Sequence, residues 1–340
     1  MHRSRFGLLT AILLAFSLLA STMAASAQSS PEASAEPATP QLPVTVTDAD
    51  GNDVTVDDVS RIVSLNGNIT EILFDLGLGD NVVAVDVTAF YPPQAAALPK
   101  IGYNRTLTAE GVLSFEPTLI IGNKEAGPED VIQQLRDSGV PVVIFEYPND
   151  PSGAADQIRE VAEAVGLGDS GDALAAHVTD QLEAAKQIVE SSSVEPRVAF
   201  LIIRGEGVQL MAGANSSADG IITAAGGINV GAEIGLQGYA PITPESMIEA
   251  APDVIVVLQD GLAASGGVEG LLQIPGVSQT PAGENENILA FNDLYILGFG
   301  PRMGDAVYDF AVALHPDVDA QPVHPEWQGT DVTPLSTPTH

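Results

Sequence analysis

Cysteine is absent from this chain of 340 residues, and basic residues are few. Without thiols the chain forms no disulfide, no thiolate metal site and no lipid-modified N-terminal cysteine. Only 12 lysines and arginines stand against 45 aspartates and glutamates, for a formal net charge of −33. A field of this sign repels nucleic acid and anionic membrane surfaces, so we expect neither as a partner.

The first residues are typical of an export signal. Arg3 and Arg5 precede an apolar run from Leu8 to Leu19, which is short for a bilayer span. The sequence ASA at 25–27 then matches the small-residue pattern of a cleavage site, which predicts a signal peptide over 1–27. We expect an exported protein, periplasmic or otherwise extracytoplasmic, that is not lipid-anchored. An uncleaved anchor helix is the alternative.

Composition separates the folded part from its flanks. Residues 28–43 are Ser, Pro, Ala and Glu with little to bury, which predicts a disordered linker, and 317–340 form a Pro-rich tail. About 270 residues lie between them, enough for two lobes. We expect a monomer.

Short apolar strands alternate with helical patterns after a hairpin signal around Asp50-Gly51. Strands are predicted at 61–65, 82–86, 118–121 and 140–145, and helices at 69–76, 109–114 and 129–138. This alternation is typical of a parallel sheet with helices on both faces.

The alternation of strands and helices is interrupted by a long helical stretch, 169–191, which would be about 33 Å long. Strands resume at 198–203, 254–258 and 288–291, and the helix starts at Thr108-Ala-Glu110 and Thr243-Pro-Glu245 echo one another. We predict an α/β fold of two lobes with central parallel sheets, joined by one long helix. The boundaries are 44–165 for the N-terminal lobe, 166–195 for the bridging helix and 196–316 for the C-terminal lobe.

Rare residue types gather in the loops that follow the predicted strands, where α/β sheets bind their ligands. The basic ones are Lys100, Arg105, Lys124, Arg204 and Arg302, and the tyrosines are Tyr103, Tyr239 and Tyr295. In so acidic a chain this favours a cleft for an anionic ligand that packs on aromatic rings. The plain alternative is that loops are simply polar.

Motifs for catalysis are absent. The chain contains no G-x-S-x-G elbow, no G-x-x-x-x-G-K-[ST] loop and no H-E-x-x-H, so we expect no enzymatic activity. The histidines of the mature chain lie outside the predicted cleft loops, which argues against an imidazole metal site. Tyrosinate, however, is an axial ligand of ferric haem. Arg105, two residues beyond Tyr103, would favour the tyrosinate or pair with a propionate.

Four stretches resemble the haemin-binding proteins of bacterial haem ABC importers, over about 45–316: RIVSLNGNITEILFDLGLGDNVVAVD, IGYNRTLTAEGVLSFEPTLII, GYAPITPESMIEAAPDVIVV and LGFGPR. This implies the class III periplasmic binding protein fold, which also serves cobalamin and ferric siderophores. The first stretch is common to the whole class, whereas G-Y-x-R followed by L-x-A-E-G-[VI]-L is more specific to the haem branch.

The resemblance implies roles for particular residues. Tyr103 would be the axial iron ligand with Arg105 as its partner, and Tyr239 a second tyrosine ligand. The other cationic cleft residues would contact the ligand: Lys124, Arg204 and Arg302. Glu71 and Glu245 would dock on arginines of the permease, a role compatible with that of ordinary first-turn glutamates.

One departure concerns the loop after the first strand of the second lobe, where some relatives have a histidine ligand. Here the loop reads Ile203-Arg204-Gly-Glu-Gly. Arg204 cannot ligate iron but could bind a propionate, so a His-ligated or stacked two-haem arrangement is not expected.

The resulting expectation is a carrier of ferric haem b that delivers it to an ABC permease with a cytoplasmic ATPase. A ferric siderophore or cobalamin carrier of the same fold is the nearest alternative. An exported enzyme or adhesin is the more distant one.

Overall fold

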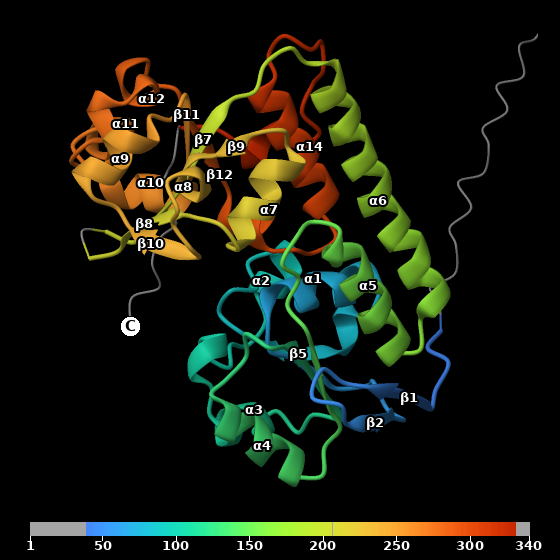
Figure 1. Cartoon of the computed structure of the whole chain (residues 1–340). Helices are drawn as coiled ribbons and strands as arrows, with labels where there is room; N and C mark the ends of the chain where they lie inside the picture. The colour runs from blue at the N-terminus through green and yellow to red at the C-terminus, as the bar shows by residue number, and fades with distance from the viewer. Residues whose placement is uncertain (1–38, 206, 331–340) are drawn as a thin grey trace, which may run out of the picture. The chain divides into compact units, whose positions relative to one another are not determined.

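The computed structural model describes residues 39–205 and 207–330 (Figure 1). The predicted signal peptide, most of the predicted linker and the last ten residues lie outside the described residues. Within the described residues, no helix combines the length and the apolar character needed to cross a membrane.

The N-terminal lobe is built on a four-stranded parallel sheet in the order β4-β3-β5-β6. Its strands are β3 (Ile62–Ser64), β4 (Val82–Val85), β5 (Leu119–Asn123) and β6 (Val142–Phe145). Every residue of β5 is buried, as expected of a central strand covered on both faces. The predicted hairpin is present as β1 (Val44–Thr47) paired with β2 (Asp53–Val56).

Helices connect these strands at the predicted places. They are α1 (Gly67–Asp75), α2 (Pro93–Ala96), α3 (Ala109–Leu113), α4 (Glu129–Asp137) and α5 (Gly153–Ala164), with short 3₁₀ turns η1 (Gly79–Asn81) and η2 (Asn104–Thr106). In α4 the buried residues Val131, Ile132 and Leu135 recur at helical spacing and face the sheet. The apolar periodicity therefore decides which face of the helix packs inward.

The predicted bridging helix is α6 (Gly168–Ser191). It packs against α5 of the N-terminal lobe and α14 (Met303–Leu314) of the C-terminal lobe (Figure 1). Two glycines allow these close contacts. A Cβ at Gly171 would lie 2.2 Å from the Ala162 Cβ, and one at Gly304 would lie 2.6 Å from the Val178 carbonyl oxygen.

The C-terminal lobe contains a mixed sheet, in the order β10-β8-β7-β11-β12 with β9 on β7. The strands are β7 (Arg197–Ile203), β8 (Gln209–Ala212), β9 (Ile228–Asn229), β10 (Tyr239–Pro241), β11 (Val254–Leu258) and β12 (Ile288–Phe291). β7, β11 and β12 run parallel as predicted, whereas β8 runs antiparallel to both of its neighbours, β7 and β10. The predicted parallel strands form the centre and one edge of this sheet, and β8 and β10 extend it at the other edge.

Seven short helices precede α14 in this lobe. They are α7 (Ser217–Ala224), α8 (Val230–Glu233), α9 (Pro244–Ala250), α10 (Gln259–Ser265), α11 (Gly267–Leu271), α12 (Pro281–Glu284) and α13 (Asp293–Leu297), with 3₁₀ turns η3 (Val277–Gln279) and η4 (Pro325–Trp327).

A buried ion pair joins the lobes. Arg302, at the start of α14, donates to both carboxylate oxygens of Glu71 on α1, at 2.7 and 2.9 Å. Their side chains are 10% and 1% exposed. The guanidinium also lies 3.8 Å from the Tyr91 ring centroid and 5.2 Å from that of Trp327, in the range of a cation–π contact.

This ion pair corrects two predictions. Glu71 was expected to dock on a permease, but it is buried and already paired, so no partner protein reaches it. Arg302 was expected to contact the ligand, but its guanidinium is hydrogen-bonded to Glu71 and lies against the Tyr91 ring.

The predicted C-terminal tail is ordered as far as the structure describes it. Gln328 forms an antiparallel bridge with Phe291 of β12, and Gly329 donates to the Ala290 carbonyl at 2.9 Å. The Asn292 amide donates to the Trp327 carbonyl at 3.0 Å. The Pro-rich segment therefore packs on the C-terminal lobe through residues 327–329, which cover part of the free edge of its sheet.

Replacing Glu71 by Gln should lower the free energy of unfolding by about 3 kcal/mol, because the Arg302 charge would remain buried without its counter-ion. Urea unfolding measures this. The double variant Glu71→Gln/Arg302→Met should recover part of the loss, and the exposed Glu249→Gln is the matched control. A Glu71→Gln variant as stable as the control would contradict this role.

Candidate functional site

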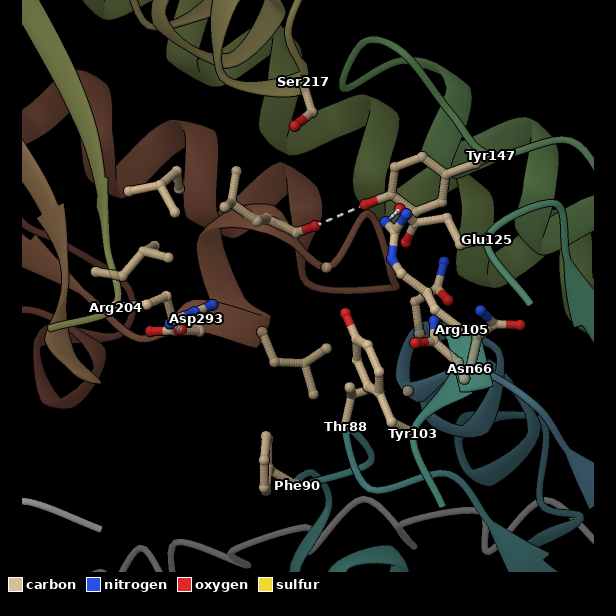
Figure 2. Close-up of a pocket in the computed structure, with 18 of the residues that line it drawn as sticks. Asn66, Thr88, Phe90, Tyr103, Arg105, Glu125, Tyr147, Arg204, Ser217 and Asp293 are labelled. Carbon is tan, nitrogen blue, oxygen red and sulfur yellow. Dashed lines mark hydrogen bonds and ion pairs between the residues drawn. The ribbon is translucent and has the colours of Figure 1, made fainter. Parts of the chain in front are cut away.

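A cavity of about 390 Å³ opens between the two lobes (Figure 2), within the usual range for small-molecule sites. The loops that follow the parallel strands line it, as predicted for this class of sheet. In the N-terminal lobe all four strands contribute: Asn66 follows β3, Thr88 and Phe90 follow β4, Glu125 follows β5 and Tyr147 follows β6.

Tyr103 projects from the N-terminal wall into the cavity (Figure 2). It is the residue before η2, and Gly102 precedes it at φ +100°, a conformation that turns the chain outward. The Tyr103 residue is 45% exposed. Its hydroxyl makes no hydrogen bond to any described residue, so the phenol oxygen is available to a ligand.

The C-terminal wall is largely apolar. Five aliphatic side chains from β7, β8, β11 and α13 form it: Ile202, Leu210, Leu258, Leu294 and Leu297. Phe90, which is 55% exposed, lies on the N-terminal side (Figure 2). A flat apolar ligand between the lobes would therefore contact carbon on both faces.

Two further tyrosines line the cavity but are already engaged. The Tyr239 hydroxyl lies 2.8 Å from the Ser217 hydroxyl, and burial raises the pKa of Tyr239. Tyr147 donates to the Leu297 carbonyl at 2.9 Å, which ties the lobes together at the back of the cavity. Burial raises the pKa of Tyr147 as well. Both phenols are therefore held protonated and hydrogen-bonded.

Two arginines reach the cavity, one from each lobe, and each is paired with a carboxylate. Arg105 pairs with Glu125 on the N-terminal wall. Arg204 lies 3.1 Å from Asp293 on the C-terminal wall. Among the described residues that line the cavity, these two carry the cationic side chains.

The remaining basic residues and Tyr295 lie elsewhere. Lys124, predicted to contact the ligand, pairs with Asp50 of the hairpin and does not line the cavity. Lys100 donates to the carbonyls of Ala89 and Ala95. Tyr295 is buried and donates to Asp309 at 2.7 Å. Counting residues by loop thus overestimated the positive charge of the cleft.

Sequence reasoning did not select Phe90, Tyr147, Ser217 or Asp293. Tyr147 and Asp293 follow β6 and β12 within two residues, so applying the strand-end rule to every strand would have found them. Phe90 and Ser217 each lie five residues beyond the end of a strand, β4 and β8, and neither is of a residue type that the charge and tyrosine pattern selects.

Exposed glutamates lie at matching places on the two lobes. Glu245 is in the first turn of α9, where Thr243 caps the helix, and Glu110 is in the first turn of α3, capped by Thr108. Both are exposed. These are the two helix starts whose sequences echo one another, Thr108-Ala-Glu110 and Thr243-Pro-Glu245.

A family model described as "Periplasmic binding protein" matches residues 62–293. The chain belongs to this family. Its match spans both lobes and the helix between them.

Solved structures of haem-binding proteins are similar to the chain. The periplasmic haem-binding protein RhuT from Roseiflexus sp. RS-1 is 47% identical, covering 76% of this chain and 99% of that chain, with a TM-score of 0.74. The periplasmic haem-binding protein HutB of Vibrio cholerae is 32% identical, covering 76% and 100%, with a TM-score of 0.69. A cobalamin-binding protein of Halobacterium salinarum is 27% identical, covering 93% of this chain and 86% of its own length.

Asp86, next to the cavity, should make the free energy of unfolding depend on pH. Asp86, at the end of β4, accepts hydrogen bonds from the amide and hydroxyl of the cavity residue Thr88. Burial raises the pKa of Asp86 to about 6. A raised carboxyl pKa contributes stability that is present below the unfolded pKa and is lost as pH rises through about 6.

Asp86→Asn should therefore remove up to about 2 kcal/mol of pH dependence from the free energy of unfolding. Urea unfolding at about pH 4.5 and about pH 7.5 measures it, with the wild type losing stability relative to the variant at the higher pH. An equal difference between the two proteins at both pH values would contradict the assignment.

Proposed function

We propose that this protein binds ferric haem b between its lobes and delivers it to an ABC import permease driven by a cytoplasmic ATPase. The observation that carries the proposal is Tyr103, a half-exposed phenol that points into the cavity, opposite an aliphatic wall, without a hydrogen-bond partner in the described residues. Tyrosinate is an established axial ligand of ferric haem. The similarity to solved haem-binding proteins supports the same ligand.

The two walls of the cavity suit different parts of the ligand. Tyr103 would coordinate the iron from the N-terminal lobe, and the aliphatic wall of the C-terminal lobe would contact the porphyrin ring. Arg105 and Arg204 are placed to attract its carboxylates. Tyr239 is the second candidate ligand, although its hydrogen bond to Ser217 would have to break before it could bind iron.

A corrinoid is the competing ligand, because relatives that match most of the chain are cobalamin-binding proteins. The unpaired phenol and the two arginines favour haem, since a phenolate prefers ferric iron and guanidinium groups prefer carboxylates. Titration with cyanocobalamin separates the two, because saturable binding of it without haemin binding would replace haem by a corrinoid.

Docking on the permease is assigned to Glu245 and, in place of Glu71, to Glu110. Each is exposed at the start of a capped helix on its own lobe. Acidic groups on both lobes could pair with arginines of the permease and position the cavity above its entrance.

The family places the protein outside the cytoplasm. We further propose that it is released as a monomer after cleavage at Ala27, because the chain has no cysteine to carry a lipid. Its role is carriage rather than catalysis.

Tyr103→Phe should weaken haemin binding about tenfold or more and shift the Soret band, because the variant cannot supply a phenolate. Visible-absorption titration of the mature protein measures both. Tyr239→Phe should change less, because Ser217 holds that phenol. A Tyr103→Phe titration that overlays the wild type would exclude Tyr103 as the ligand.

Glu110→Arg and Glu245→Arg should each reduce haemin uptake into proteoliposomes that hold the cognate permease and ATPase. Haemin affinity in solution should stay unchanged, because neither residue lines the cavity. Glu129→Arg, an exposed change of equal charge on α4, is the control. Uptake reduced equally by all three variants would indicate a general charge effect instead of a docking site.

A further inference from the structure

The two ion pairs of the cavity share an arrangement that the proposed function does not require. In each pair the arginine side chain is the more exposed partner, 56% for Arg105 and 53% for Arg204. The carboxylates are set deeper in the wall, with Glu125 30% and Asp293 23% exposed. All four side chains line the cavity, and in each pair the cation is the more exposed partner.

The backbone beside each carboxylate is held in place. The Glu125 amide donates to the Asn123 side chain at 3.0 Å, and Asp293 is the first residue of α13, which Asn292 caps. Burial raises the pKa of both carboxyl groups, and the paired arginine opposes this shift in each case. Each carboxylate therefore depends on its arginine to keep its charge in the wall.

We infer that Glu125 and Asp293 are internal counter-ions that determine ligand specificity, because a carboxylate of the ligand must displace them to reach Arg105 and Arg204. The inference rests on the proposed function. A ligand without carboxylates leaves both pairs intact and gains nothing from the arginines. A weakly binding anion is disfavoured because it must replace the half-buried carboxylate that already pairs with each arginine.

Removing the negative charge of Glu125 or Asp293, which competes with the ligand for an arginine, should strengthen binding of a porphyrin with two carboxylates. Glu125→Gln and Asp293→Asn keep the size of each side chain but release the arginine. We expect haemin affinity to rise about fivefold for each variant, the size expected from freeing one part-exposed ion pair. Haemin dimethyl ester, which lacks free carboxylates, should bind wild type and variants equally.

Visible-absorption titrations with haemin and with its dimethyl ester test this, with Glu129→Gln as a control for the change in net charge. Unchanged or weaker haemin binding in both variants would overturn the inference, as would an equal gain for the ester. If only one variant binds haemin more tightly, the inference is overturned for the carboxylate of the other lobe. If the wild type binds neither porphyrin, the proposed function fails, whereas wild-type binding without a variant effect removes only this inference.

Discussion

The bidentate ion pair between Arg302 and Glu71 is the constraint on which the cavity depends. It fixes α1 of one lobe against the start of α14 of the other, and both elements adjoin loops that line the cavity. Tyr91, stacked on the guanidinium, directly follows Phe90, a cavity residue. The position of the ligand site is therefore tied to a buried charge pair outside it, with little freedom for the lobes to open.

Polar and apolar chemistry are divided between the walls. The N-terminal lobe presents the unpaired phenol of Tyr103 and several polar loops, whereas aliphatic side chains dominate the C-terminal wall. This division follows from the topology, because the parallel strands of the first sheet all end at the cavity. In the second sheet β8 runs antiparallel and contributes Leu210 from within a strand.

Local periodicity predicted the secondary structure well. The α4 helix was expected at 129–138 and spans Glu129–Asp137, and β11 spans the predicted residues. The antiparallel strand β8 was missed because QLMA is neither a continuous apolar run, as in β4 and β6, nor long enough to show an alternation. Pairing across the chain was also beyond prediction: Glu71 and Arg302 are 231 residues apart, and nothing near either residue indicates its partner.

The candidate site was predictable in part. The rule that ligands bind at strand ends found Tyr103, Arg105, Arg204 and Tyr239, all of which line the cavity. It could not tell that Lys124 turns toward the hairpin, because an ion pair with Asp50 is decided by tertiary contacts. Nor could it show that both cavity arginines already have counter-ions.

The segment that covers β12 affects the tendency of the protein to associate with itself. β12 is an outer strand of its sheet, and residues 328 and 329 occupy part of its hydrogen-bonding edge. Open strand edges recruit other chains and promote aggregation. Shortening the chain before Trp327 would expose this edge and remove the Trp327 ring from the Arg302 guanidinium, so residues 327–329 act as a cap against self-association.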